Sequence, residues 1–134
     1  MKRNQPTVLL SDSEAAALLA ARLAPATCYS RVEDLVREQS LSSVTVLVVD
    51  SPRQPLGMLL VMLGRMNVEY PAMQKVALMD GPPPLPIAEY LTACGVDLVW
   101  TGSGEERIEQ LAAVVGRMHE RTSWMTDSLT SVRL

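Results

Sequence analysis

The apolar residues of the chain fall alternately into short continuous runs and longer stretches with helical spacing. The run at 44–49 is rich in β-branched residues and too short for a helix, which is typical of a strand buried on both faces. Stretches such as 108–118 instead place apolar residues three and four positions apart, as a helix with one buried face does. The expected strands are 7–10, 26–29, 44–49, 75–79 and 96–101, and the expected helices are 15–23, 32–36, 56–66, 87–93 and 108–118.

Strict alternation of strands and helices with short loops predicts the fold class. It indicates an α/β, three-layer doubly wound sandwich with a five-strand parallel sheet and helices on both faces. We expect 44–49 at the centre of the sheet because it is the longest continuously apolar strand. Ser30 and Glu33 have the spacing of a capping box, and Gly95 is suited to follow the C-terminus of the helix at 87–93. Residues 1–118 are expected to form one domain, and 119–134 a polar tail or the start of a linker.

Composition excludes several classes of protein. The chain has 134 residues, of which 48% are hydrophobic and 20% charged, and this is typical of one globular domain. A net charge of −3 argues against direct nucleic-acid binding, and no apolar run approaches the roughly 20 residues of a membrane span. Cys28 and Cys94 lack metal-site spacing and are expected to be small buried hydrophobic residues of a cytoplasmic protein. His119 is the single histidine, so no catalytic triad is expected.

Three carboxylates follow predicted strands. Asp12, Asp50 and Asp80 follow the first, third and fourth strands, whose ends lie at one edge of a parallel sheet. Converging carboxylates could hold Mg²⁺, which prefers oxygen ligands, and Asp12 with Asp50 are the candidate pair for weak metal binding. The alternative is that each is a turn or helix-cap residue. Both interpretations stay open for Asp12, whereas we favour a functional origin for Asp50 and a turn for Asp80.

In the order and spacing of its elements, the stretch from 7 to 117 resembles the receiver domain of bacterial response regulators. The resemblance implies a flavodoxin-like topology and a phosphorylation site at the strand ends. On that pattern Asp50 matches the phospho-acceptor and Asp12 the second acid of the family, whereas Ser11 replaces the first acid. Asp80 stands where the family has a hydroxyl residue and Thr101 where it has a lysine. The resemblance rests on Ser11-Asp12, 46–50, Met79-Asp80-Gly81 and 95–102.

The departures from the family pattern indicate a degenerate site. Thr101 supplies no positive charge to a phosphoryl group. An ionised Asp80 would repel one, at a cost of about 4 kcal/mol for charges ~4 Å apart at an effective dielectric of 20. We therefore expect a pseudo-receiver, not an enzyme, that acts by protein–protein contacts with a protein partner or an attached output domain, with no membrane association. The first alternative is a phospho-accepting receiver that uses Asp50 with Mg²⁺. The second is a small nucleotide-binding protein that uses the turn at 102–104, although it lacks a phosphate-loop motif.

The resemblance also implies a homodimer interface made by the fourth helix, the fifth strand and the fifth helix. The apolar face of 108–118 is wider than one narrow stripe, so part of it is available to a partner. The alternative is a broad core face. The candidate interface residues are Ile87, Tyr90, Leu91, Trp100, Ile108, Leu111, Val114 and Val115.

Overall fold

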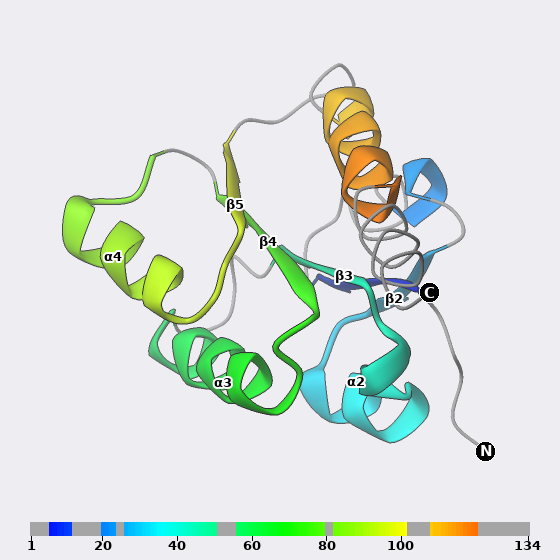
Figure 1. Cartoon of the computed structure of the whole chain (residues 1–134), viewed down its shortest axis with the longest axis horizontal. Helices are drawn as coiled ribbons and strands as arrows, with labels where there is room; N and C mark the ends of the chain where they lie inside the picture. The colour runs from blue at the N-terminus through cyan, green and yellow to red at the C-terminus, as the bar shows by residue number, and fades with distance from the viewer. Residues whose placement is uncertain are drawn as a thin grey trace, which may run out of the picture.

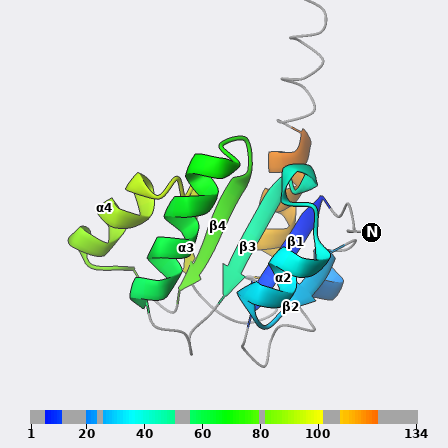
Figure 2. The same ribbon diagram turned by 90° about the horizontal axis from the view of Figure 1, so that it is seen from below.

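Five parallel strands form one sheet in the order β2-β1-β3-β4-β5 (Figures 1 and 2). The structure is a computed structural model that describes residues 6–11, 20–23, 26–50, 56–79, 82–101 and 108–120. The strands are β1 (Thr7–Ser11), β2 (Ala26–Tyr29), β3 (Val46–Asp50), β4 (Gln74–Met79) and β5 (Leu98–Thr101). The predicted parallel sheet with β3 at its centre is thereby confirmed.

Helices cover both faces of this sheet (Figure 1). On one face lie α2 (Val32–Glu38), the short 3-10 helix η1 (Leu41–Ser43), α3 (Leu56–Glu69) and α4 (Leu85–Ala93). The other face carries the helical residues 20–22 and the helix over 108–120. Alternate residues of β1 divide between the two layers: Val8 and Leu10 pack with the first set of helices, and Leu9 with the second. The predicted three-layer α/β sandwich is confirmed.

Complete burial of the central strands follows from this double cover. Every residue of β1 is buried, and in β3 the first four residues are buried while Asp50 at its end is half-buried. A strand buried on both faces has no polar side, which explains the continuous apolar runs in the sequence. The core is aliphatic on both sides of the sheet, with Leu63 and Leu111 as fully buried helix residues on opposite faces.

Several element ends differ from the sequence prediction. α2 begins at Val32 with Arg31 as its N-cap, one residue later than a capping box of Ser30 and Glu33 would place it, and Arg31 makes no side-chain capping bond. β5 begins at Leu98 because the amide of Val96 donates to the Leu91 carbonyl, 3.0 Å away, in the turn that ends α4. Gly95 follows α4 with a φ of 79°, as predicted for the residue after a helix.

Four helices are longer than predicted, among them α2, which continues to Glu38, and α4, which begins at Leu85. α3 continues to Glu69, and the last helix continues through residue 120. His119, which the sequence prediction assigned to the tail, therefore lies in a helix, and its Nε2 is 2.6 Å from Oγ1 of Thr7. The division of the chain at residue 118 stays a prediction. Within the described ranges, no helix is both long enough and apolar enough to cross a membrane.

Candidate functional site

The candidate site lies at the carboxyl edge of the sheet, where β1 and β3 end side by side. Ser11 and Asp50 are the last residues of these two neighbouring strands and are paired in register. The Ser11 hydroxyl donates a hydrogen bond to Oδ2 of Asp50 at 3.1 Å. Ser11 is only 2% exposed, so a buried hydroxyl holds one oxygen of the candidate phospho-acceptor.

Thr101 ends β5 at the same edge, but at some distance from Asp50. It pairs with Met79 of β4, and β4 separates β5 from β3. Two strand spacings of nearly 5 Å put the ends of β3 and β5 about 10 Å apart. A long lysine side chain could cross that distance, whereas the hydroxyl of Thr101 is short and uncharged. Asp12, Asp80 and the turn at 102–104 lie outside the described residues.

Cys28 adds a thiol beside this pair. It lies on β2 and pairs with Leu9 of β1. Leu9 precedes Ser11 by two residues, so the side chains of Cys28, Leu9 and Ser11 lie on the same face of the sheet. Burial raises the pKa of the Cys28 thiol; a hydrogen bond with the Ser11 backbone opposes this rise, and the nearby charge of Asp50 adds to it. The thiol is therefore protonated near neutral pH and is a poor nucleophile. Sequence reasoning did not connect Cys28 with the site. The connection depends on the pairing register of β1 and β2, which the structure supplies.

A metal site is not formed by the described residues alone. In the described ranges, no group of three or more His, Cys, Asp and Glu side chains lies together. Asp50 offers one carboxylate, and one of its oxygens already accepts the Ser11 hydroxyl. Mg²⁺ is usually held in near-octahedral geometry by one or two carboxylates and several waters, so a second carboxylate beside Asp50 would have to come from Asp12, which lies outside the described residues. Weak Mg²⁺ binding by Asp12 with Asp50 stays a prediction.

The candidate interface residues divide between core and surface. Leu91, Leu111 and Val115 are 1–3% exposed and pack against the sheet, so they belong to the core of the monomer. Tyr90 is 62% exposed. The remaining four are partly buried: Ile87, Trp100, Ile108 and Val114. The apolar residues of the last helix therefore serve largely the core, and a homodimer interface through the fourth helix, fifth strand and fifth helix stays a prediction.

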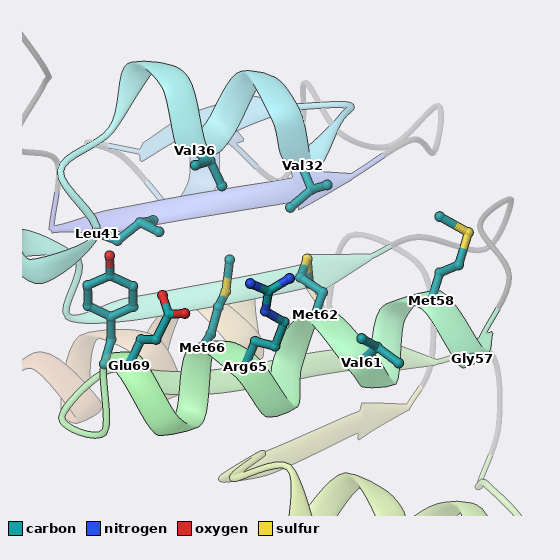
Figure 3. Close-up of a pocket in the computed structure, with 11 residues that line it drawn as sticks. Val32, Val36, Leu41, Gly57, Met58, Val61, Met62, Arg65, Met66 and Glu69 are labelled. Carbon is teal, nitrogen blue, oxygen red and sulfur yellow. The ribbon is translucent and has the colours of Figure 1, made fainter.

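An apolar groove that the sequence did not predict lies between α2 and α3 (Figure 3). Its volume is about 590 Å³. Val32 and Val36 of α2 line one side, and Met62 and Met66 of α3 line the other. Sequence periodicity identified α3 as a helix but did not indicate which of its apolar residues would stay at the surface.

Comparison with known proteins identifies the fold. The sequence matches no family model and no curated protein. A CheY-like protein (TadZ) from Pseudomonas aeruginosa PAO1 is similar in structure, with a TM-score of 0.66 and 16% identity over 86% of this chain and 99% of that chain. The signal receiver domain of an HD domain-containing protein from Pseudomonas fluorescens Pf-5 has a TM-score of 0.63 and 17% identity, over 95% of this chain and 96% of that one.

A third similar structure is a putative pilus assembly protein (CpaE) from Burkholderia thailandensis E264. Its TM-score is 0.62 at 16% identity, over 87% of this chain and 99% of that one. At these identities the similarity concerns the fold. The strand order, the two helical layers and these structures agree, and the chain therefore has the fold of response-regulator receiver domains.

Proposed function

We propose that this chain is a receiver-like signalling module that acts through protein–protein contacts and does not use phosphorylation of Asp50 as its switch. The observation that carries the proposal is the pairing of Asp50 with Ser11 at the end of the central strands. In the resembling family an acid stands at the position of Ser11 and a lysine at that of Thr101. Here both positions hold uncharged hydroxyl residues.

The physical argument concerns the charge of an acyl phosphate. A phosphoryl group carries between one and two negative charges near neutral pH and needs cations or donors close by. Thr101 is uncharged and supplies neither a cation nor a charged donor. A phosphoryl group on Asp50 would therefore lack the partner on β5 through which the family couples phosphorylation to a change of conformation.

Several further statements belong to this proposal. The module is not an enzyme, and its partner is another protein or an attached output domain. Cys28 and Cys94 are free thiols, which supports a cytoplasmic location. Some similar structures are described as pilus assembly proteins and one as an orphan response regulator. The receiver fold thus occurs in more than one setting, and the proposal names no pathway.

Acetyl phosphate with Mg²⁺ tests the proposal. The chain is incubated with both and its intact mass is measured, beside an Asp50→Asn variant and a receiver that has the complete family site. We expect no stoichiometric gain of a phosphoryl group and no change of oligomeric state. A matched pair of variants follows: Thr101→Lys, which supplies the missing charge, is expected to raise any residual labelling, whereas Thr101→Val leaves it unchanged. Stoichiometric labelling that depends on Asp50 and changes the oligomeric state would overturn the proposal in favour of a phospho-accepting receiver.

A further inference from the structure

The outward face of α3 is unusually apolar for a surface helix. Its exposed residues recur three and four positions apart and so share one face of the helix. Met58, Val61 and Val68 on this face are 66%, 65% and 80% exposed. The outer face of a surface helix is normally polar, and exposed apolar patches mark contact sites. Between residues 57 and 69 of α3, the exposed residues are Gly57, Met58, Val61, Arg65, Val68 and Glu69.

Two charges complete this face. Arg65 and Glu69 are both exposed and lie one helical turn apart. Within the described part of the chain, neither forms an ion pair or a hydrogen bond. An arginine that precedes a glutamate by four residues is the less favourable order for a pair within one helix. Both charges are therefore available to a partner.

We infer that α3 packs antiparallel against α3 of a second copy of this chain. When two identical helices run antiparallel with Arg65 opposite Glu69, the same contact repeats by two-fold symmetry, so the face is its own complement. Each dimer then contains two identical charge pairs. In an antiparallel pair the positive end of each helix dipole also lies beside the negative end of the other, which is a favourable interaction. The inference rests on the proposed function, because it names the protein contact through which the module would act.

The apolar residues fit the same arrangement. The two-fold axis passes beside residue 67, midway between Arg65 and Glu69, so Val68 lies next to the axis and meets Val68 of the other copy. Val61, two turns away, meets the exposed turn at Pro71 and Ala72 that follows α3 in the other copy. The groove between α2 and α3 opens beside this contact, and its flexible Met62 side chain can shift to fill space left at the rim (Figure 3).

Self-complementarity favours a second copy over an unrelated helix. One surface supplies both members of each charge pair and the apolar residues around them. An unrelated partner would instead have to present an acid opposite Arg65, a base opposite Glu69 and an apolar face at matching spacing. Binding of such a partner by a chain that stays monomeric is an outcome that the following test distinguishes.

Charge-swapped variants test the dimer by sedimentation equilibrium of the full chain, from micromolar to submillimolar concentration. We expect wild-type chains to dimerise. Arg65→Glu and Glu69→Arg each replace two attractions by two repulsions, and each should weaken dimerisation by at least about tenfold. The double variant R65E/E69R should restore it. An equimolar mixture of the two single variants should form a heterodimer, because glutamates of one chain then face arginines of the other.

Matched controls separate this contact from general charge effects. Arg117→Glu on the helix over 108–120 and Glu89→Arg on α4 make the same charge changes at exposed positions outside α3. Both should leave dimerisation unchanged. Because all four positions are exposed, circular dichroism should show the same fold in every variant.

The possible results are distinct. A wild-type chain that stays monomeric both with and without acetyl phosphate, single variants that dimerise as wild type does, or a mixture that forms no heterodimer would each overturn the α3 contact and leave the proposed function standing. The measurements are repeated with acetyl phosphate and Mg²⁺. Dimerisation that requires phosphorylated Asp50 would overturn the proposed function, whereas the charge-swap pattern would still identify α3 as the surface.

Discussion

The hydrogen bond between Ser11 and Asp50 gives the most specific prediction about the candidate site. Ser11→Ala removes the donor, Asp50→Ala removes the acceptor, and the double variant closes a mutant cycle. If Asp50 is held by its neighbour on β1, the two single changes should be coupled. The cycle isolates the pair from other interactions that either side chain makes.

The expected coupling follows from the geometry. A hydrogen bond to a charged group contributes about 1.5–3 kcal/mol to stability, and the strongest hydroxyl–carboxylate bonds are shorter than this one. At 3.1 Å, with the donor buried and the acceptor half-buried, we expect a coupling free energy of about 1 kcal/mol. In a domain of this size that corresponds to a shift in Tm of about 3–6 °C.

Urea unfolding followed by tryptophan fluorescence measures the cycle. Thr101→Val, combined with Ser11→Ala, is the control pair, because β3 and β4 separate the strands on which the two residues lie. That pair should be additive to within about 0.3–0.5 kcal/mol. A coupling between Ser11 and Asp50 no larger than that of the control pair would refute the reasoning, since the Ser11 hydroxyl would then not hold the carboxylate in place.

Two further changes test the core and the pH dependence of stability. Leu111→Ala should destabilise the fold by about 2–5 kcal/mol, because Leu111 is 1% exposed. Tyr90→Ala should cost less than about 0.5 kcal/mol, because Tyr90 is 62% exposed. Similar losses of unfolding free energy for the two variants, measured in urea, would contradict this division between core and surface. Burial lowers the pKa of His119 below its ordinary 6.5, so the unfolded chain takes up the proton first and stability should fall as the pH drops below about 6.5. His119→Gln should flatten that part of the stability profile, and an unchanged slope would show that His119 is not its origin.

The sheet could be predicted from the sequence because its central strands are buried on both faces. β1 contains Val8-Leu9-Leu10 and β3 contains 46–49 without a polar residue among them, and such runs are typical of strands that are buried on both faces. The position of Asp50 at the carboxyl edge followed directly. The hydrogen bond between Asp50 and Ser11 could not be predicted, because it depends on the register between two strands that are far apart in the sequence.

Lys75 illustrates what local pattern leaves out. A lysine is normally exposed, yet Lys75 is 1% exposed and its amine donates to the Met73 carbonyl at 3.0 Å. Burial lowers the pKa of Lys75, and the charge of Asp97 opposes this shift. Nothing near Lys75 in the sequence signals this burial, which follows from the pairing of β4 with its neighbours in the sheet.

The surfaces were harder to predict than the core. Periodicity showed that the helices over 108–120 and 56–69 each carry many apolar residues, but not which residues would face the sheet. In the last helix Leu111 and Val115 are in the core, whereas α3 leaves Val61 and Val68 exposed. That difference depends on which side of each helix packs against the sheet, and only the three-dimensional structure supplies this.

The central claim is that a phosphoryl group at Asp50 does not switch this domain. Beryllofluoride with Mg²⁺ is a stable mimic of a phosphorylated aspartate, and ¹⁵N-labelled chain titrated with it reports both binding and any change of conformation. We predict backbone amide spectra that stay unchanged at Asp50, along β5 and across α4. Saturable shifts at Asp50 that extend to Thr101 and α4, and that are lost in Asp50→Asn, would contradict the account.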